Sequence, residues 1–132
     1  MKSEAWVPRF LADRTLAKLE DMDLARVGPF LRAYVESIVV RPLLVSGMCA
    51  EAKIPPKDAP DRRYLILVDA ELSLPERLRT LFHELIHIQL FVAGVAARYH
   101  DESQIEACAI RLADRYPEAI GIFCEVFPSI VP

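Results

Sequence analysis

His83, Glu84 and His87 stand at the spacing His-Glu-x-x-His, in the segment His83-Glu84-Leu85-Ile86-His87. Histidines four residues apart lie on one face of an α-helix, so both imidazoles can bind one metal ion. Zinc suits such a pair, at about 2.0–2.1 Å from each nitrogen. Glu84 lies about 100° further round the helix, near enough to take a proton from a zinc-activated water. The pattern therefore predicts a hydrolytic zinc site, with His83 and His87 as ligands and Glu84 as general base.

The alternative is that these three residues are ordinary helix positions. Their segment is apolar nearly all round, from Leu78 to Phe91, which is typical of a central helix. Three polar side chains on such a helix would be costly to bury without partners. The surroundings therefore favour a functional site.

A catalytic zinc site needs a third protein ligand and one position open to water. Glu106 is the favoured ligand, because it stands in an otherwise apolar stretch where a carboxylate needs a partner. Its alternative role is a capping box with Ser103. Glu102 shares its helix face, but a solvated position in the first turn is the favoured interpretation of this residue. His100 and Asp101, just before that helix, are further alternatives.

The elements that must position these groups have clear signals in the sequence. The motif helix is predicted from Leu74 to about Gly94, with Ser73 as its cap and Glu76 closing a capping box. The apolar run Tyr64–Asp69 predicts a strand before it. A helix from Asp101 or Ser103 to about Arg115 would carry the third ligand.

The rest of the chain is predicted to frame this unit. The expected elements are a helix from Pro8 to about Asp23, a second from Pro29 to about Val40, a short strand over Leu43–Gly47, an irregular loop over Ile54–Asp61, and an apolar tail over 118–132 that could form a short helix on the core.

Composition and charge narrow the class of protein. The 132 residues suit one domain, and a formal charge of −3 gives no reason to expect nucleic acid or an anionic membrane as partner. We expect no signal peptide at residues 1–6 and no membrane span, since no run reaches about 18 apolar residues. Cys49, Cys108 and Cys124 are too few and too far apart for a disulfide scaffold. They predict reduced, mostly buried thiols in a cytoplasmic protein.

Together these pieces resemble the ImmA/IrrE-type metallopeptidases, which are Glu-zincins. The resemblance spans 64–117 and includes the strand, the charged segment 76–82, the motif, Glu106-Ala107 and Pro117. It implies an α+β fold, a small and mostly helical zincin-like domain with a short β-sheet next to the motif helix. It also implies His83, His87 and Glu106 as zinc ligands, Glu84 as general base, and a regulatory protein as substrate.

Three positions depart from the family pattern. Ile86 and Arg111 stand where small residues are common, and Cys108 stands where Asn or Asp is usual. The zinc-binding core of the pattern is nevertheless complete.

The predicted protein is a single zinc metallopeptidase domain over 1–132, with N-terminal helices over 8–42, the strand, motif helix and third-ligand helix over 64–117, and a C-terminal tail. Its partner would be a protein or peptide substrate. The alternative is a non-catalytic zinc-binding regulatory or interaction module that retains the site geometry.

Two further features of a peptidase site have candidates in the sequence. An extended peptide could pair with the edge of the strand Tyr64–Asp69, although a plain core strand is an equal alternative. Oxyanion stabilisation could come from Tyr99, His100, Arg111 or Tyr116, and none is favoured. The sequence carries no signal for the cleavage site or the oligomeric state.

Overall fold

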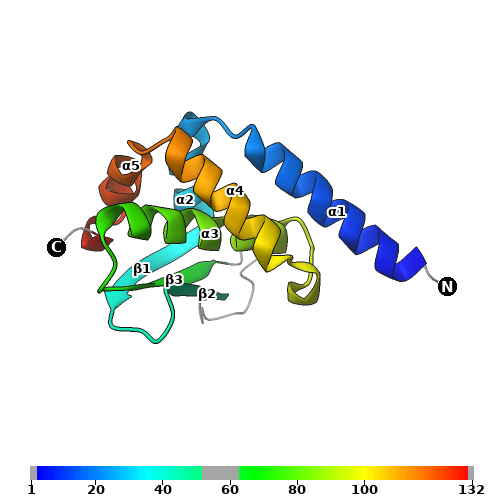
Figure 1. Ribbon diagram of the computed structural model, residues 1–132, viewed down its shortest axis with the longest axis horizontal. Coiled ribbons are helices and arrows are strands. Elements are labelled where there is room, and N and C mark those ends of the chain that lie inside the picture. Colours follow the sequence, from blue (N-terminus) through cyan, green and yellow to red (C-terminus); the bar gives the residue numbers. More distant parts are fainter. Residues whose placement is uncertain (1–2, 52–62, 131–132) are drawn as a thin grey trace.

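The computed structural model describes residues 3–51 and 63–130, and Figure 1 follows them from the N-terminus in blue to the C-terminus in red. In chain order the elements are α1 (Ser3–Glu20), the 3-10 helix η1 (Leu24–Arg26), α2 (Val27–Tyr34), β1 (Val35–Arg41), β2 (Gly47–Glu51), β3 (Tyr64–Asp69), α3 (Leu74–Val92), η2 (Ala97–Tyr99), α4 (Glu102–Arg115), α5 (Ala119–Val126) and η3 (Pro128–Ile130).

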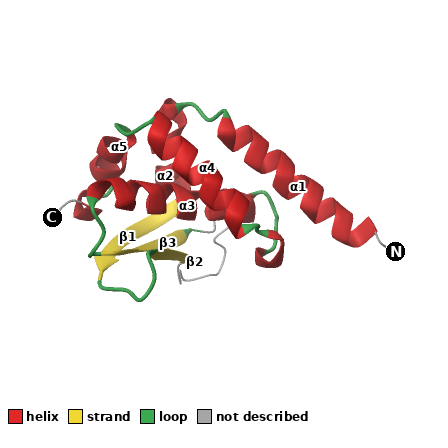
Figure 2. Ribbon diagram, in the orientation of Figure 1, coloured by secondary structure: helices red, strands yellow, loops and turns green. Residues whose placement is uncertain are grey.

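The three described strands form a mixed sheet in the order β1-β3-β2, with β1 parallel and β2 antiparallel to β3. The helices gather on one face of this sheet (Figure 2). On β3, Tyr64, Ile66 and Val68 are buried and alternate with half-exposed residues, as a strand with one covered face requires. The predicted α+β fold, with a short sheet beside the motif helix, is confirmed.

The position of β3 decides one open question about the sheet. β3 is paired on both sides, so it cannot offer a free edge to a peptide, and the prediction of that role for Tyr64–Asp69 is wrong. Its alternative as a core strand is confirmed. Among the described strands, β2 and β1 form the two edges.

The motif helix α3 begins and ends as the sequence predicts. The Ser73 hydroxyl accepts from the Glu76 amide, and the Glu76 carboxylate accepts from the Ser73 amide at 2.9 Å, which completes the capping box. At the other end Gly94 has a φ of 93°, and the Val95 amide donates to the Leu90 carbonyl at 2.9 Å. This is a Schellman turn, and it fixes the path of the chain that leaves the helix.

α4 packs against α3 and α1 contacts both helices, while the N-terminal end of α1 extends past the rest of the molecule (Figure 1). Cys108, Ala109 and Leu112 are buried on the inner side of α4. Cys108 lies against Glu20 of α1, and the small side chains on this side of α4 let the helix pack closely against its neighbours. α4 thereby brings its first two turns to the histidines of α3.

Three predicted elements are corrected by the structure. The helix expected from Pro29 to Val40 stops at Tyr34 and continues as β1, where four β-branched residues favour the extended chain. The strand expected over Leu43–Gly47 begins only at Gly47. Pro8 lies within α1 and does not open it, since that helix begins at Ser3. The predicted loop over Ile54–Asp61 lies outside the described residues.

The remaining elements agree with the sequence. β3 spans the predicted residues, α4 ends at Arg115, and the apolar tail forms α5 with Phe123 buried in the core. The three cysteines are free, Cys108 buried and the other two half-buried. No helix of the described chain is long and apolar enough to cross a membrane. The single-domain organisation and the cytoplasmic location stay predictions.

Candidate metal centre

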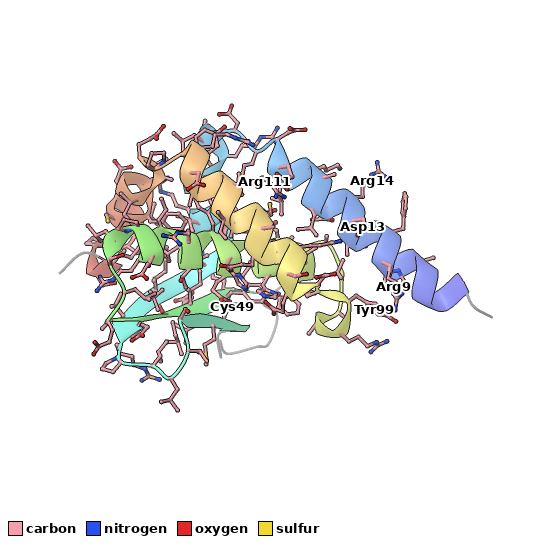
Figure 3. The ribbon with its side chains drawn as sticks, in the orientation of Figure 1. Arg9, Asp13, Arg14, Cys49, Tyr99 and Arg111 are labelled. Atoms are coloured by element: carbon pink, nitrogen blue, oxygen red, sulfur yellow. The ribbon has the colours of Figure 1, made fainter. Side chains whose placement is uncertain are left out.

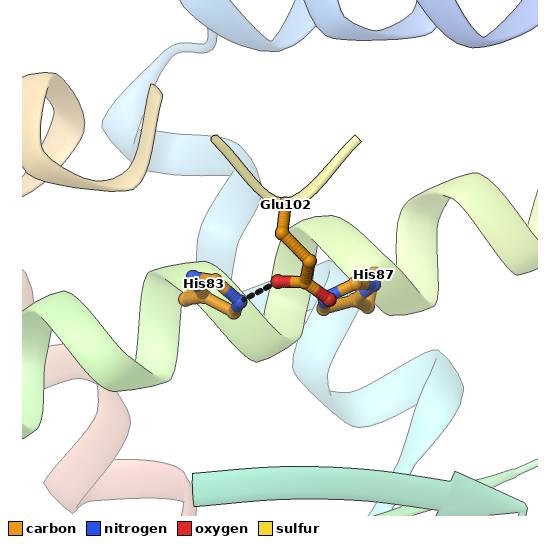
Figure 4. A group of neighbouring side chains, drawn as sticks. All are labelled: His83, His87 and Glu102. Atoms are coloured by element: carbon orange, nitrogen blue, oxygen red, sulfur yellow. Dashed lines mark hydrogen bonds and ion pairs between the residues drawn. The ribbon is translucent and has the colours of Figure 1, made fainter. Parts of the chain in front are cut away.

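His83 and His87 project from the same face of α3 toward the first turn of α4. Their ring centroids lie 5.0 Å apart. The Glu102 carboxylate lies between them (Figure 4), with Oε1 at 2.9 Å from His83 Nε2 and Oε2 at 3.1 Å from His87 Nε2. The neighbouring helices α3 and α4 thus bring two imidazoles and one carboxylate to a single point.

The chemistry and spacing of these three groups fit a metal ion. One ligand atom from each of His83, His87 and Glu102 lies within 4.8 Å of the other two. Tetrahedral zinc with bonds of about 2.1 Å would separate its ligand atoms by about 3.4 Å. The nitrogen–oxygen distances of 2.9 and 3.1 Å would need to widen by only a few tenths of an ångström. Two neutral nitrogens and one carboxylate oxygen are also a donor set that zinc accepts in catalytic sites.

Glu106, the ligand favoured from the sequence, reaches the other nitrogen of His83. Its Oε1 lies 2.6 Å from His83 Nδ1, on the side of the ring away from Glu102. Glu106 does not close a capping box with Ser103, because Asp101 caps α4 by accepting from the amides of Ser103 and Gln104. Asp101 is thereby occupied at the helix start.

Glu84 is buried on the side of α3 that faces the sheet, with 6% of its surface exposed. Burial raises the pKa of this carboxyl group, and the neighbouring His83 and a hydrogen bond from the Cys49 thiol oppose that rise. A raised pKa brings a carboxylate closer to the value that suits a base at neutral pH. The position beside His83 and the shifted pKa agree with the predicted role of Glu84.

β2 comes unusually close to α3 at this point. A Cβ on Gly47 would lie 2.5 Å from Thr80 Cγ2 and 2.9 Å from the Leu67 carbonyl oxygen, so only glycine fits. This close approach brings Cys49, labelled in Figure 3, to Glu84. Burial and the Glu84 carboxylate raise the pKa of the Cys49 thiol, which keeps it protonated and able to donate.

His87 is held on its far side by a second histidine. Its Nδ1 lies 2.7 Å from Nδ1 of His100, and His100 Nε2 lies 3.0 Å from the Val95 carbonyl oxygen. Burial lowers the pKa of His87. A lowered pKa favours the neutral imidazole, which is the form that binds metals.

A cavity of about 330 Å³ opens beside these groups. It is lined by residues of β2, α3, η2 and the start of α4, namely Gly47, Met48, Cys49, His83, Glu84, His87, Phe91, Ala97, His100 and Glu102. The candidate base and the three candidate ligands therefore face one space that an edge strand borders.

Of the four residues considered for oxyanion stabilisation, three have partners and Tyr99 lines a different cavity. Arg111 pairs with Glu20 of α1, and the Tyr116 hydroxyl donates to the Met22 carbonyl. Figure 3 shows Tyr99 on the side of α1, where it lines a separate cavity of about 440 Å³. Both ring nitrogens of His100 have partners. None of the four is directed at the cavity with a free donor.

Two participants in this site were not found from the sequence. Cys49 was expected to be a plain buried thiol, and Gly47 the end of a strand. Cys49 has no local signal, because its place in the site depends on how β2 pairs with β3 and packs on α3. A glycine within a strand, as a mark of close approach, is the one hint available.

Comparison with known families agrees with the geometry. The family model of the IrrE N-terminal-like domain, Peptidase_M78, matches residues 48–116, slightly more than half of the chain. The matched region runs from β2 to the end of α4 and so contains all residues of the candidate metal centre. No curated protein and no solved structure matches the chain.

Proposed function

Because the chain belongs to the IrrE N-terminal-like domain family of peptidases, we propose that it is a zinc metallopeptidase. The observation that carries the proposal is the convergence of His83, His87 and Glu102 on one point, with the buried Glu84 beside them. The metal would be zinc, since two histidines, one carboxylate and a neighbouring glutamate are the set that zinc hydrolases use.

Glu102 is the third ligand in this proposal, and Glu106 is its supporting partner. Glu102 lies against Nε2 of both histidines, whereas Glu106 lies against Nδ1 of His83 alone. A carboxylate on the outer nitrogen of a ligating histidine fixes the ring and raises its basicity. The two residues are one helical turn apart on the same face of α4. This face therefore supplies both the third ligand, Glu102, and the carboxylate that supports His83, Glu106.

Zinc bound at these three groups would supply a Lewis acid that lowers the pKa of a coordinated water toward 7. Glu84 would take a proton from the attacking water and pass it to the leaving amine. The Cys49 thiol donates to the Glu84 carboxylate and so orients it. The buried position of Glu84 shields this proton transfer from bulk water.

The substrate in this proposal is a peptide or protein segment in extended form. β2 is an edge of the described sheet and borders the cavity through Gly47, Met48 and Cys49. An extended chain can add to such an edge by main-chain hydrogen bonds. The role first considered for β3 thus passes to β2. A regulatory protein remains the substrate that the family resemblance implies.

The general-base role is tested by Glu84→Gln. We expect the wild-type protein to cleave members of a mixed peptide library, with mass spectrometry as the readout, and Glu84→Gln to keep its zinc and lose at least about 100-fold of the cleavage rate. Glu71→Gln is the control, since Glu71 is exposed before α3. Full cleavage by Glu84→Gln would contradict the assignment.

The ligand assignment is tested by comparing Glu102→Gln with Glu106→Gln. We expect Glu106→Gln to lower zinc affinity about 10- to 100-fold, as loss of a supporting partner does. Glu102→Gln should lower it further, because a ligand is lost. Chelator competition measures both affinities. A larger loss for Glu106→Gln would restore Glu106 as the ligand, as first predicted.

A non-catalytic zinc-binding module is the second candidate. It is favoured by one observation on the four residues considered for oxyanion stabilisation. His100, Arg111 and Tyr116 have partners, and Tyr99 lines the separate cavity. Zinc bound at one ion per chain, with no library peptide cleaved by the wild type, would select this alternative.

A further inference from the structure

We propose that His100 is a positioning residue that accepts the Nδ1 proton of His87 and thereby holds His87 Nε2 toward the metal. The inference rests on the proposed function, because it concerns the same site. It assigns a task to a histidine that is neither a ligand nor the base.

The tautomer of His100 follows from its contact with Val95. His100 Nε2 lies 3.0 Å from the Val95 carbonyl oxygen. A carbonyl oxygen only accepts hydrogen bonds, so the proton of the His100 ring must sit on Nε2. A neutral His100 then has its lone pair on Nδ1.

The contact between the two histidines fixes the second tautomer. His87 Nδ1 and His100 Nδ1 are 2.7 Å apart, which is hydrogen-bond distance and leaves room for one proton. Since His100 Nδ1 is the acceptor, His87 Nδ1 must donate. The lone pair of His87 is then on Nε2, the nitrogen that lies 3.1 Å from Glu102 Oε2.

The ring of His100 is held in place by the local structure around it. The Schellman turn at Gly94 fixes Val95, whose side chain is buried, and thereby places the accepting carbonyl. The Phe91 ring packs against His100 with a centroid distance of 4.5 Å. The turn at the end of the motif helix thus supports a metal ligand of that same helix, through a hydrogen bond between residues five positions apart.

The two ligating histidines are consequently supported in different ways. His83 has a carboxylate, Glu106, on its outer nitrogen, whereas His87 has a neutral imidazole. A carboxylate adds negative charge to the site, and an imidazole orients the ligand without adding charge. Loss of His100 should therefore disturb ring orientation and tautomer and leave the charge of the site unchanged.

The hydrogen bond itself can be measured in the intact protein. In uniformly ¹⁵N-labelled wild-type protein loaded with zinc, we expect a nitrogen–nitrogen scalar coupling between His87 Nδ1 and His100 Nδ1, with the shared proton attached to His87. This measurement needs no variant. Absence of the coupling, or a proton attached to His100 Nδ1, overturns the proposal.

Two substitutions test what the hydrogen bond does. His100→Phe keeps an aromatic ring beside Phe91 and removes both nitrogens, so zinc affinity should fall about 10- to 100-fold. His100→Asn can place its amide oxygen where Nδ1 stands, so it should recover most of that loss and keep the His87 Nδ1 proton protected from exchange. Tyr99→Phe is the control, because Tyr99 faces the separate cavity.

The outcomes separate this inference from the proposed function. Wild-type zinc affinity in a folded His100→Phe variant overturns the role of His100, and so does an equal loss in His100→Asn. Failure of the proposed function has a different signature: the coupling and the loss of affinity are observed as expected, while no peptide is cleaved.

Discussion

Gly47→Ala tests the close contact between β2 and the motif helix. The added Cβ would lie 2.5 Å from Thr80 Cγ2 and 2.9 Å from the Leu67 carbonyl oxygen. Carbon atoms in ordinary contact are about 3.5–4.0 Å apart, so β2 must move by about 1 Å or more. Thr80 is buried and Leu67 belongs to the central strand, so neither can yield easily.

The change in the free energy of unfolding caused by Gly47→Ala is the sum of two opposed effects. Overpacking of this kind typically costs about 1–3 kcal/mol. Glycine-to-alanine exchange also restricts the unfolded chain, which stabilises by about 0.4–1 kcal/mol where the residue fits. We expect a net loss of about 1–2 kcal/mol, which for a chain of this size lowers Tm by roughly 3–8 °C. Urea unfolding and calorimetry measure the two quantities.

Gly47→Ala should lower the cleavage rate and leave zinc affinity unchanged. The metal ligands come from α3 and α4, so zinc affinity should stay close to that of the wild type. Displacement of β2 moves Cys49 away from Glu84 and shifts the edge that borders the cavity, so cleavage should fall about tenfold, which corresponds to about 1.4 kcal/mol in the barrier.

Two companion variants sharpen the experiment. Thr80→Ser removes Cγ2, so the double variant with Gly47→Ala should recover part of the lost stability. Gly121→Ala is the matched control, since nothing lies within 4 Å of its added Cβ. It should stabilise α5 by about 0.5–1 kcal/mol. A Gly47→Ala protein as stable as the wild type would refute the close packing of β2 on α3.

The remaining predictions concern the helix ends and the pH dependence of stability. Gly94→Ala forces a side chain onto a φ of 93° and should lower the free energy of unfolding by about 1–2 kcal/mol. Zinc binding should also weaken, because the turn places the Val95 carbonyl that holds His100. Unchanged thermal stability would contradict the Schellman turn. Ser73→Ala removes the cap of α3 and should cost about 1 kcal/mol in urea unfolding, whereas no change would mean that the capping box contributes nothing. The hydrogen bond from Arg111 lowers the pKa of Glu20 below 4.5, so this pair stabilises the folded state above pH 4.5, and its contribution is lost as the pH falls through the lowered value. Stability measured from pH 6 to about 3 should therefore fall less steeply in Glu20→Gln; an identical profile would exclude the pair as a cause.

The parts of the fold that the sequence predicted well are those with strong local signals. α3 has its own cap, capping box, apolar periodicity and terminal glycine, and its predicted limits agree with the structure to within two residues. β3 is a continuous apolar run, and its limits are those predicted. Local signals of this kind need no knowledge of distant partners.

The parts that were mispredicted depend on distant contacts. β1 was expected to be helical because its apolar residues follow those of α2; pairing with β3, about thirty residues away, stabilises the extended form that its β-branched residues favour. The edge position of β2 and the central position of β3 are likewise properties of the assembled sheet. Sequence patterns carry no information on strand order.

In the candidate site, too, some residues have a local signal in the sequence and others depend on distant contacts. His83, Glu84 and His87 are recognisable from their spacing alone. Glu102 and Glu106 share one face of α4, and their different contacts depend on how far α4 is shifted along α3, which spacing does not specify. The roles of His100 and Cys49 depend on a turn and a strand pairing and have no pattern of their own.

A crystal structure of the zinc-loaded protein, with anomalous data at the zinc edge, tests the metal centre most directly. We predict one strong peak bonded to His83 Nε2, His87 Nε2 and a Glu102 oxygen, with Glu106 on His83 Nδ1 and Glu84 beside the open position. A peak bonded directly to Glu106 in place of Glu102 would contradict the ligand assignment, and a peak away from both histidines would contradict the site itself.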